Sequence, residues 1–176
     1  MIQPLPLQAA NTGKTIDKPQ WLSTLLGVVR AYQAFDLISD THIRKLGLTS
    51  PQFDIIVTLG NTPGLTCGEI GERTLITKGT LTGVLDRLEL KGMLTRIVAE
   101  EDRRSFKVKL TRKGQACFES VFPTHLAYMD QYFSQLSHEE RAMIEQGMQC
   151  FRDVLGTLPR NVLGNLPHVL RDDQDR

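Results

Sequence analysis

The sequence has little of what disulfide-rich and metal-binding proteins depend on. Its 176 residues include only three cysteines, Cys67, Cys117 and Cys150, which are far apart and form no CxxC pair. This spacing argues against a disulfide framework and against a zinc knuckle. The four histidines form no HxxxH or HExxH pattern, so we expect no metal site.

Long apolar runs are absent as well. No stretch of about eighteen or more apolar residues occurs, which argues against a membrane-spanning helix. The N-terminus, MIQPLPLQAANTGKT, lacks the basic start and the apolar core of a secretory signal. We therefore expect a cytoplasmic protein with no membrane partner.

The motifs of common enzyme classes are also missing. There is no Gly-rich phosphate loop, no nucleophile elbow and no paired-carboxylate motif. A chain of 176 residues fits one domain, or one domain with an extension, and leaves no room for a separate catalytic domain. We expect neither an enzyme nor a bound cofactor.

Charge is nearly balanced over the whole chain but unevenly distributed. The net charge is +1. From Arg73 to Lys113 there are eleven Lys and Arg against five Asp and Glu, a net charge of +6, so the remaining residues carry −5. A neutral protein with one basic block is typical of a module that meets a polyanion on one side.

Helical periodicity begins after a Pro-rich, polar segment, residues 1–19, which we expect to be a flexible arm. Apolar residues then recur every three or four positions from Trp21, which predicts a long helix ending near Gly47. Three short helices follow, with start signals at Ser50 and Pro51, at Thr66 and Glu69, and at Thr77.

After Gly92 the periodicity changes from helical to alternating. Residues 93–100 and 105–111 alternate apolar and polar side chains, which predicts two half-buried strands joined by the charged sequence EEDRR. The residues expected to face inward are Ile97, Phe106, Val108 and Leu110. The two strands therefore form a hairpin with a charged tip.

Two long helices complete the predicted fold. Thr111 begins one that runs to about Leu136, and Ser137 with Glu140 begins another that runs to about Leu158. Four helices, two strands and two helices, in that order, predict a mainly α (α+β) winged helix-turn-helix. We assign an arm (1–19), an N-terminal dimerisation helix (20–47), a winged helix-turn-helix DNA-binding domain (48–111), C-terminal dimerisation helices (112–158) and an extension (159–176).

The long terminal helices carry apolar stripes with no obvious internal partner except each other. Pairing with a second copy is the simplest way to bury them, which predicts a homodimer. A monomer in which these helices close a bundle is the alternative.

The fourth predicted helix has a core face and an outer face. Its core face is Leu81, Val84, Leu85 and Leu88, spaced i, i+3, i+4 and i+7. The outer positions with small, hydroxyl or basic side chains are Lys78, Gly79, Thr80, Thr82 and Gly83. Such residues near a helix N-terminus allow close approach to phosphates and base edges. Ordinary helix crossing is the alternative role for Gly83.

The hairpin tip carries the second candidate contact. Two adjacent arginines at the end of a hairpin suit insertion into a DNA minor groove. We expect Arg103 and Arg104 to contact DNA, Asp102 to orient an arginine, and Lys107 to follow the phosphate backbone. Ordinary solvated surface charge is the alternative.

Two segments give these features a family resemblance. TLTGVLDRLELKGMLTR resembles the recognition helix and first wing strand of the MarR family of bacterial transcriptional regulators. DRRSFKVKLTRKG resembles the Asp-x-Arg wing of that family and the Leu-Thr-x-x-Gly start of its next helix. The resemblance extends over residues 21–158, with its motifs in 48–114.

The resemblance implies a sequence-specific regulator, usually a repressor, that binds a pseudo-palindromic double-stranded DNA operator as a homodimer. It implies recognition helices in major grooves and wings in flanking minor grooves, with Arg104 in the groove and Arg103 on phosphate or as a second groove contact. Gly83 departs from the family pattern, because many members have arginine there. Arg87 would brace the wing through an acid or contact phosphate. A winged-helix module that binds protein and not DNA is the alternative, against which the basic block argues.

Many members of the family also bind a small phenolic or aromatic carboxylate effector between the dimerisation helices and the winged domain. The candidate pocket residues here are Tyr32, Phe35, His42, His125 and Tyr128. Ordinary core packing is their alternative role. Cys67 lies near a helix start, where the dipole favours a reactive thiolate. A buried, inert thiol is the expectation for it.

Overall fold

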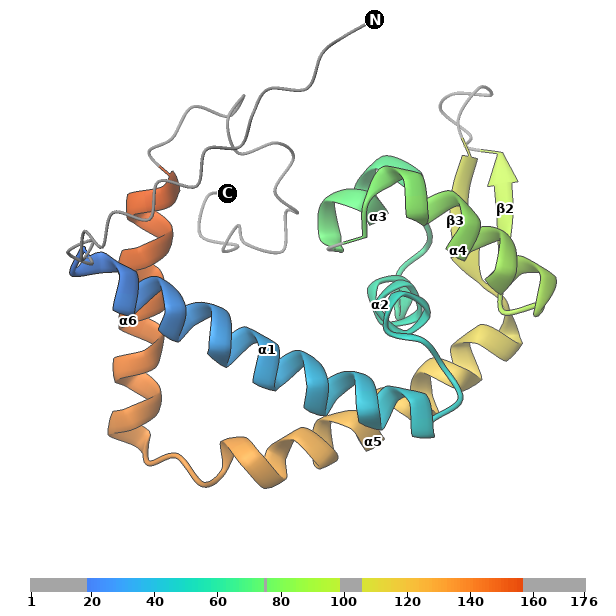
Figure 1. Ribbon diagram of the computed structural model, residues 1–176. Coiled ribbons are helices and arrows are strands. Elements are labelled where there is room, and N and C mark those ends of the chain that lie inside the picture. The colour runs from blue at the N-terminus through green and yellow to red at the C-terminus, as the bar shows by residue number, and fades with distance from the viewer. Residues whose placement is uncertain (1–18, 75, 99–105, 157–176) are drawn as a thin grey trace, which may run out of the picture. The chain divides into compact units, whose positions relative to one another are not determined.

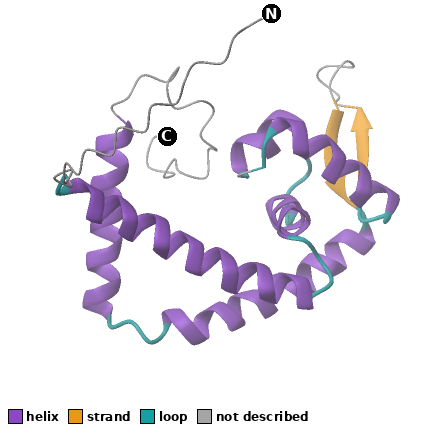
Figure 2. Ribbon diagram, in the orientation of Figure 1, coloured by secondary structure: helices purple, strands orange, loops and turns teal. Residues whose placement is uncertain are grey.

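The computed structural model describes residues 19–74, 76–98 and 106–156 of the chain (Figure 1). The predicted arm and C-terminal extension lie outside these residues, apart from residue 19. The chain divides into two compact units, residues 1–36 and 37–176, and the boundary lies within helix α1 (Trp21–Lys45). Helices dominate the described residues, and a small sheet accompanies them (Figure 2). The predicted mainly α fold class is confirmed.

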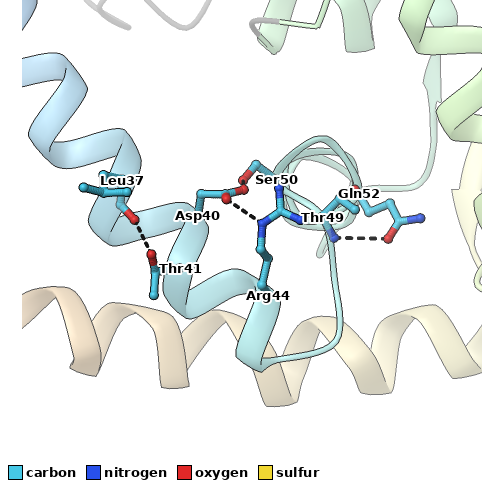
Figure 3. Close-up of polar contacts among 7 residues, drawn as sticks. All are labelled: Leu37, Asp40, Thr41, Arg44, Thr49, Ser50 and Gln52. Carbon is cyan, nitrogen blue, oxygen red and sulfur yellow. Dashed lines mark hydrogen bonds and ion pairs between the residues drawn. The ribbon is translucent and has the colours of Figure 1, made fainter.

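Helix α2 (Ser50–Leu59) begins differently from its prediction. The N-cap is Thr49, whose backbone N–H donates to Oε1 of Gln52 at 3.2 Å, and Pro51 lies in the first turn. Ser50 is already helical, and its hydroxyl donates to Oδ1 of Asp40 on α1 at 2.7 Å (Figure 3). The predicted cap at Ser50 is therefore wrong, because its side chain bonds α1 and not the start of its own helix.

Helix α3 (Cys67–Arg73) begins with the predicted capping box. The Thr66 N–H donates to Oε2 of Glu69 at 2.7 Å, and the Glu69 N–H donates to Oγ1 of Thr66 at 3.2 Å. These two bonds satisfy backbone donors that a helix start otherwise leaves unpaired. Cys67, the first residue of α3, is exposed, so the expectation of a buried thiol is wrong.

Helix α4 (Lys78–Leu90) follows Thr77 at the N-cap, as predicted. The Thr77 hydroxyl bonds the hydroxyl of Thr80 at 3.1 Å. The chain leaves α4 at Gly92, whose φ of +68° lies in the left-handed region that glycine adopts at low cost.

The sheet has one strand more than predicted. Strands β1 (Leu65–Thr66), β2 (Leu94–Val98) and β3 (Phe106–Leu110) are antiparallel in the order β1-β3-β2. Leu65 pairs with Val108 on one side, and Arg96 pairs with Val108 on the other. Two residues are too few to show an alternating pattern, so β1 has no signal in the sequence.

Two of the four predicted inward residues of the strands are confirmed. Val108 is fully buried and Leu110 is 8% exposed. Ile97 and Phe106, at 41% and 52% exposed, are not in the core. On β2 the inward residue is Leu94, which pairs with Leu110, so the pleat turns Ile97 to the opposite face. Phe106 shares the face of Val108 but lies at the outer end of its strand.

The core of the winged domain lies around α2. This helix contacts α3, α4, α5 and β3. The largest fully buried side chains come from α2, α3, α4 and the sheet: Ile55, Ile56, Leu59, Ile70, Val84, Leu85, Leu88, Leu94 and Val108. Every element of the domain therefore buries its apolar face against one continuous cluster.

Helix α5 (Arg112–Phe133) begins at the predicted cap, because Oγ1 of Thr111 accepts from the Gly114 N–H at 3.1 Å. It ends three residues before the predicted Leu136. Helix α6 (His138–Gly156) begins with the predicted capping box of Ser137 and Glu140. No residue of α6 is buried. None of the described helices is long and apolar enough to span a membrane.

Candidate nucleic-acid interface

The outer face of α4 contributes no buried residue to the core of the described part of the chain. Leu81, Val84, Leu85 and Leu88 are buried, as predicted. The candidate contact residues on the other faces are exposed or, for Gly83, half-buried: Lys78, Gly79, Thr80, Thr82, Gly83 and Arg87. The helix therefore keeps its apolar face in the core and leaves these six residues accessible.

The two glycines of this face are not required by packing. A Cβ placed on Gly79 would have no atom within 4 Å. A Cβ on Gly83 would meet Nη1 of Arg87 at 3.8 Å, which is an ordinary contact. Helix crossing therefore does not explain Gly83. Because these glycines have no side chain, another molecule can come close to the backbone of α4 at these two positions.

We call the β2–β3 hairpin the wing and α4 the recognition helix. Arg96 joins the two through ion pairs. From the middle of β2 its Nη2 donates to Oδ1 of Asp86 at 2.5 Å, and its Nη1 pairs with Oε2 of Glu89. The hydrogen bond to Asp86 raises the pKa of Arg96, so its charge is constant at all physiological pH values. This clamp fixes the angle between hairpin and helix.

Sequence reasoning missed Arg96 and assigned the bracing role to Arg87 as one of two alternatives. The structure pairs the acids of α4 with Arg96, while Arg87 is exposed. The available signal was the spacing of Asp86 and Glu89, which places both carboxylates on one side of α4. Only the register of the hairpin reveals which arginine they meet.

The wing supplies two lysines from β3. Lys107 is half-buried and Lys109 is exposed, and both point away from the face that holds Val108. Lys107 also lies near enough to Glu69 to affect its pKa. Hydrogen bonds from Thr66 are the main cause of the lowered pKa of Glu69, and the positive charge of Lys107 lowers it further. The predicted tip residues Asp102, Arg103 and Arg104 lie outside the described residues.

The recognition helix is also tied to α5. Oγ1 of Thr111 donates to the Gly92 carbonyl at 2.7 Å, and the Thr111 N–H donates to the Met93 carbonyl at 3.0 Å. Nζ of Lys113 donates to the Lys91 carbonyl at 2.8 Å. These bonds join the residues that follow α4 to the start of α5.

Three of the five predicted pocket residues meet within the 37–176 unit. Nδ1 of His42 lies 3.0 Å from Nδ1 of His125, and the ring of Tyr128 stacks on His42 with centroids 3.9 Å apart. Ser39 and Phe53, which sequence reasoning did not select, also contact His125. Tyr32 and Phe35 belong to the 1–36 unit, where they are 52% and 45% exposed.

Comparison with known proteins identifies the family. A family model described as "MarR family" matches residues 46–105. The HTH-type transcriptional regulator MhqR of Bacillus subtilis (strain 168) is 33% identical over 122 residues, which cover 69% of this chain and 84% of MhqR. Streptococcus pneumoniae FabT, in a crystal structure with DNA, aligns with a TM-score of 0.64 and 24% identity over 79% of this chain and 99% of FabT.

A third relative is Bordetella bronchiseptica BpsR, whose DNA binding is regulated by 6-hydroxynicotinic acid. It aligns with a TM-score of 0.63 and 27% identity, over 75% of this chain and 98% of BpsR. MhqR is matched over most of its length, and the matched family model covers the recognition helix and most of the wing. The chain therefore belongs to the MarR family of DNA-binding transcriptional regulators.

Proposed function

We propose that this regulator is a homodimeric, effector-responsive repressor that binds a pseudo-palindromic operator. The observation that carries the proposal is the outer face of α4. It has exposed lysine and threonine side chains and two glycines without a packing role, and Arg96 holds it beside a lysine-bearing wing. A helix face of this kind, in a basic block, suits the major groove of DNA.

The roles within the interface follow from position. Lys78 and Thr80 lie in the first turn of α4, where backbone N–H groups and the helix dipole favour phosphate. Thr82 and Gly83 lie one turn further along and would face base edges. Arg104 is assigned to the minor groove by its place in the Asp-x-Arg motif, with Arg103 and Lys107 on phosphate.

The homodimer follows from apolar surface that the single chain leaves exposed. On α6 this surface includes Met143, Ile144 and Met148, at 68%, 48% and 43% exposed. The first half of α1 separately exposes Trp21 and Val29, at 62% and 41%. Faces of this extent on two long helices are typical of a subunit interface. Two copies would then present two recognition helices to the two halves of an operator.

The proposed effector is a small aromatic acid or phenol. The support is the group of rings formed by His42, His125, Tyr128 and Phe53, which combines aromatic faces with polar ring atoms. BpsR responds to a hydroxylated aromatic acid, 6-hydroxynicotinic acid. An effector of the same class would bind here between the end of α1 and α5 and lower the affinity for DNA.

The test is binding to DNA from the region upstream of the protein's own gene, measured by fluorescence anisotropy over a salt series. Specific binding should survive excess competitor DNA, and log K should fall by about 0.9 per phosphate contacted for each tenfold rise in salt. Arg104→Ala should weaken binding while the dimer stays folded. If the protein binds no upstream fragment even at low salt, the proposal fails.

A further inference from the structure

The contact between His42 and His125 has an unusual hydrogen-bond requirement. The two rings face each other through Nδ1 atoms 3.0 Å apart. At that distance one Nδ1 must carry the proton and the other must accept it. Nε2 of His125 lies 3.4 Å from Oγ of Ser39, which can donate or accept and so suits either arrangement of the ring protons.

The number of protons on the pair decides whether this bond exists. With one proton on each ring, the Nδ1–H of one histidine donates to the bare Nδ1 of the other. A third proton placed on an outer Nε2 leaves that bond intact. A fourth proton puts two N–H groups and two positive charges head to head at 3.0 Å, so the contact must open.

The surroundings of the pair oppose its positive charge. On α1, Lys45 acts on His42, whereas Asp40 and Arg44 are paired with each other. On α5 the neighbouring titratable groups are the phenols of Tyr128 and Tyr132, whose hydroxyls lie 3.2 Å apart. Helix α2 contributes the uncharged ring of Phe53 and carries Asp54 as the next residue. The hydrogen bonds of the two rings join them to each other and to Ser39.

We propose that His42 and His125 form a proton-sensitive latch, which holds the end of α1 on α5 at neutral pH and opens in acid, weakening operator binding. Burial is the main cause that lowers the pKa of each ring, and Lys45 for His42 and His42 for His125 lower it further. Each ring therefore has a lower pKa in the folded than in the unfolded protein. The contribution of the latch to folding stability is complete above the unfolded pKa of about 6.5 and is lost as the pH falls below that value.

The latch lies between two connections to the DNA-binding surface. One turn of α1 carries His42 and also Asp40, which bonds Ser50 at the start of α2 (Figure 3). His125 lies on α5, whose first residues bond the end of α4. Opening the latch leaves these connections free to move separately. Operator affinity then falls in proportion to the fraction of protein that remains latched.

The experiment compares operator affinity from about pH 7.5 to about pH 5.5, at constant ionic strength and without effector, across the range in which histidine titrates. The variants are His42→Gln, His125→Gln and the control His138→Gln, which removes an exposed histidine on α6. Wild type and His138→Gln should lose roughly tenfold more affinity over this range than the two latch variants, the factor expected when about one tenth of the protein remains latched at the acid end.

Parallel pH profiles for all four proteins would overturn the latch. Since His125 is buried, His42→Gln is the deciding variant if His125→Gln unfolds. Ring C–H signals in NMR provide a second measurement. Two histidines should titrate below the ordinary histidine pKa of about 6.5 in wild type. In His42→Gln the pKa of His125 should rise, because the charge of His42 no longer opposes its protonation. Operator binding by the wild type at pH 7.5 tests the proposed repressor separately, because the latch is closed at that pH whether or not it opens in acid.

Discussion

Arg96 connects the two parts of the proposed DNA-binding surface through two ion pairs, with Asp86 and with Glu89. The pairs are partly exposed, so we expect each to contribute only about 0.2 to 1 kcal/mol to the free energy of unfolding. Their larger effect is on geometry. A double variant, Asp86→Asn with Glu89→Gln, removes two negative charges and should strengthen DNA binding if only charge matters. We expect weaker operator binding in fluorescence anisotropy, because the wing is no longer held.

The matched control for this variant is Glu119→Gln on α5, which changes charge away from the clamp. It should leave operator affinity unchanged or slightly raised. If the double variant binds the operator as tightly as the control does, the clamp has no role in DNA recognition.

Gly83 separates stability from function at a single position. Alanine there meets only an ordinary contact with Arg87, so Gly83→Ala should raise the free energy of unfolding by about 0.5 to 1 kcal/mol through helix propensity. The added methyl group would also stand on the face of α4 that is proposed to approach DNA. We therefore expect a more stable protein, by urea denaturation, that binds its operator more weakly.

Gly71→Ala on α3 is the control for Gly83, because its Cβ would also meet only an ordinary contact, with Leu81 at 3.7 Å. The two substitutions should stabilise the protein alike, and only Gly83→Ala should affect DNA. Equal operator affinity in both variants would show that α4 does not come close to DNA at this point.

At the scale of elements, the start of α5 packs closely against the segment that joins α4 to β2. A Cβ on Gly114 would collide with the backbone oxygen of Met93, which lies between α4 and β2. Because a backbone atom cannot move aside like a flexible side chain, Gly114→Ala should destabilise the protein by about 1 to 3 kcal/mol, measured as a lower midpoint of urea unfolding. Gly71→Ala, with an ordinary contact to Leu81 at 3.7 Å, should not. Equal midpoints would contradict the close approach.

At the scale of the whole molecule, the proposed dimer would bury apolar side chains of α6 that a single chain leaves exposed. Ile144→Glu places a charge in the exposed apolar stripe of α6 and should convert the dimer to monomers in analytical ultracentrifugation. Operator affinity should fall with it, since one recognition helix would then bind alone. Gln146→Glu changes charge on the polar side of the same helix and should leave the dimer intact. If the Ile144→Glu protein is still a dimer, the apolar stripe of α6 is not part of the interface.

Local chemistry in the sequence determined the elements and their order. Periodicity identified the helices, and short-range signals placed the starts of α3, α5 and α6 at Thr66, Thr111 and Ser137, because a cap depends only on residues three positions apart. The basic block and the two motifs identified the family in the same way. Ser50 is the exception among the starts, because its hydroxyl bonds Asp40, ten residues away.

Only the tertiary structure decided which distant side chains meet. The register of β2 on β3 turned Leu94 inward and Ile97 outward, added β1 to the sheet, and brought Arg96 to the acids of α4. The packing of α1 on α5 placed His42 against His125, which are 83 residues apart. Neither contact leaves a periodic trace in the sequence, because each depends on how separate elements pack and not on the spacing of residues within one.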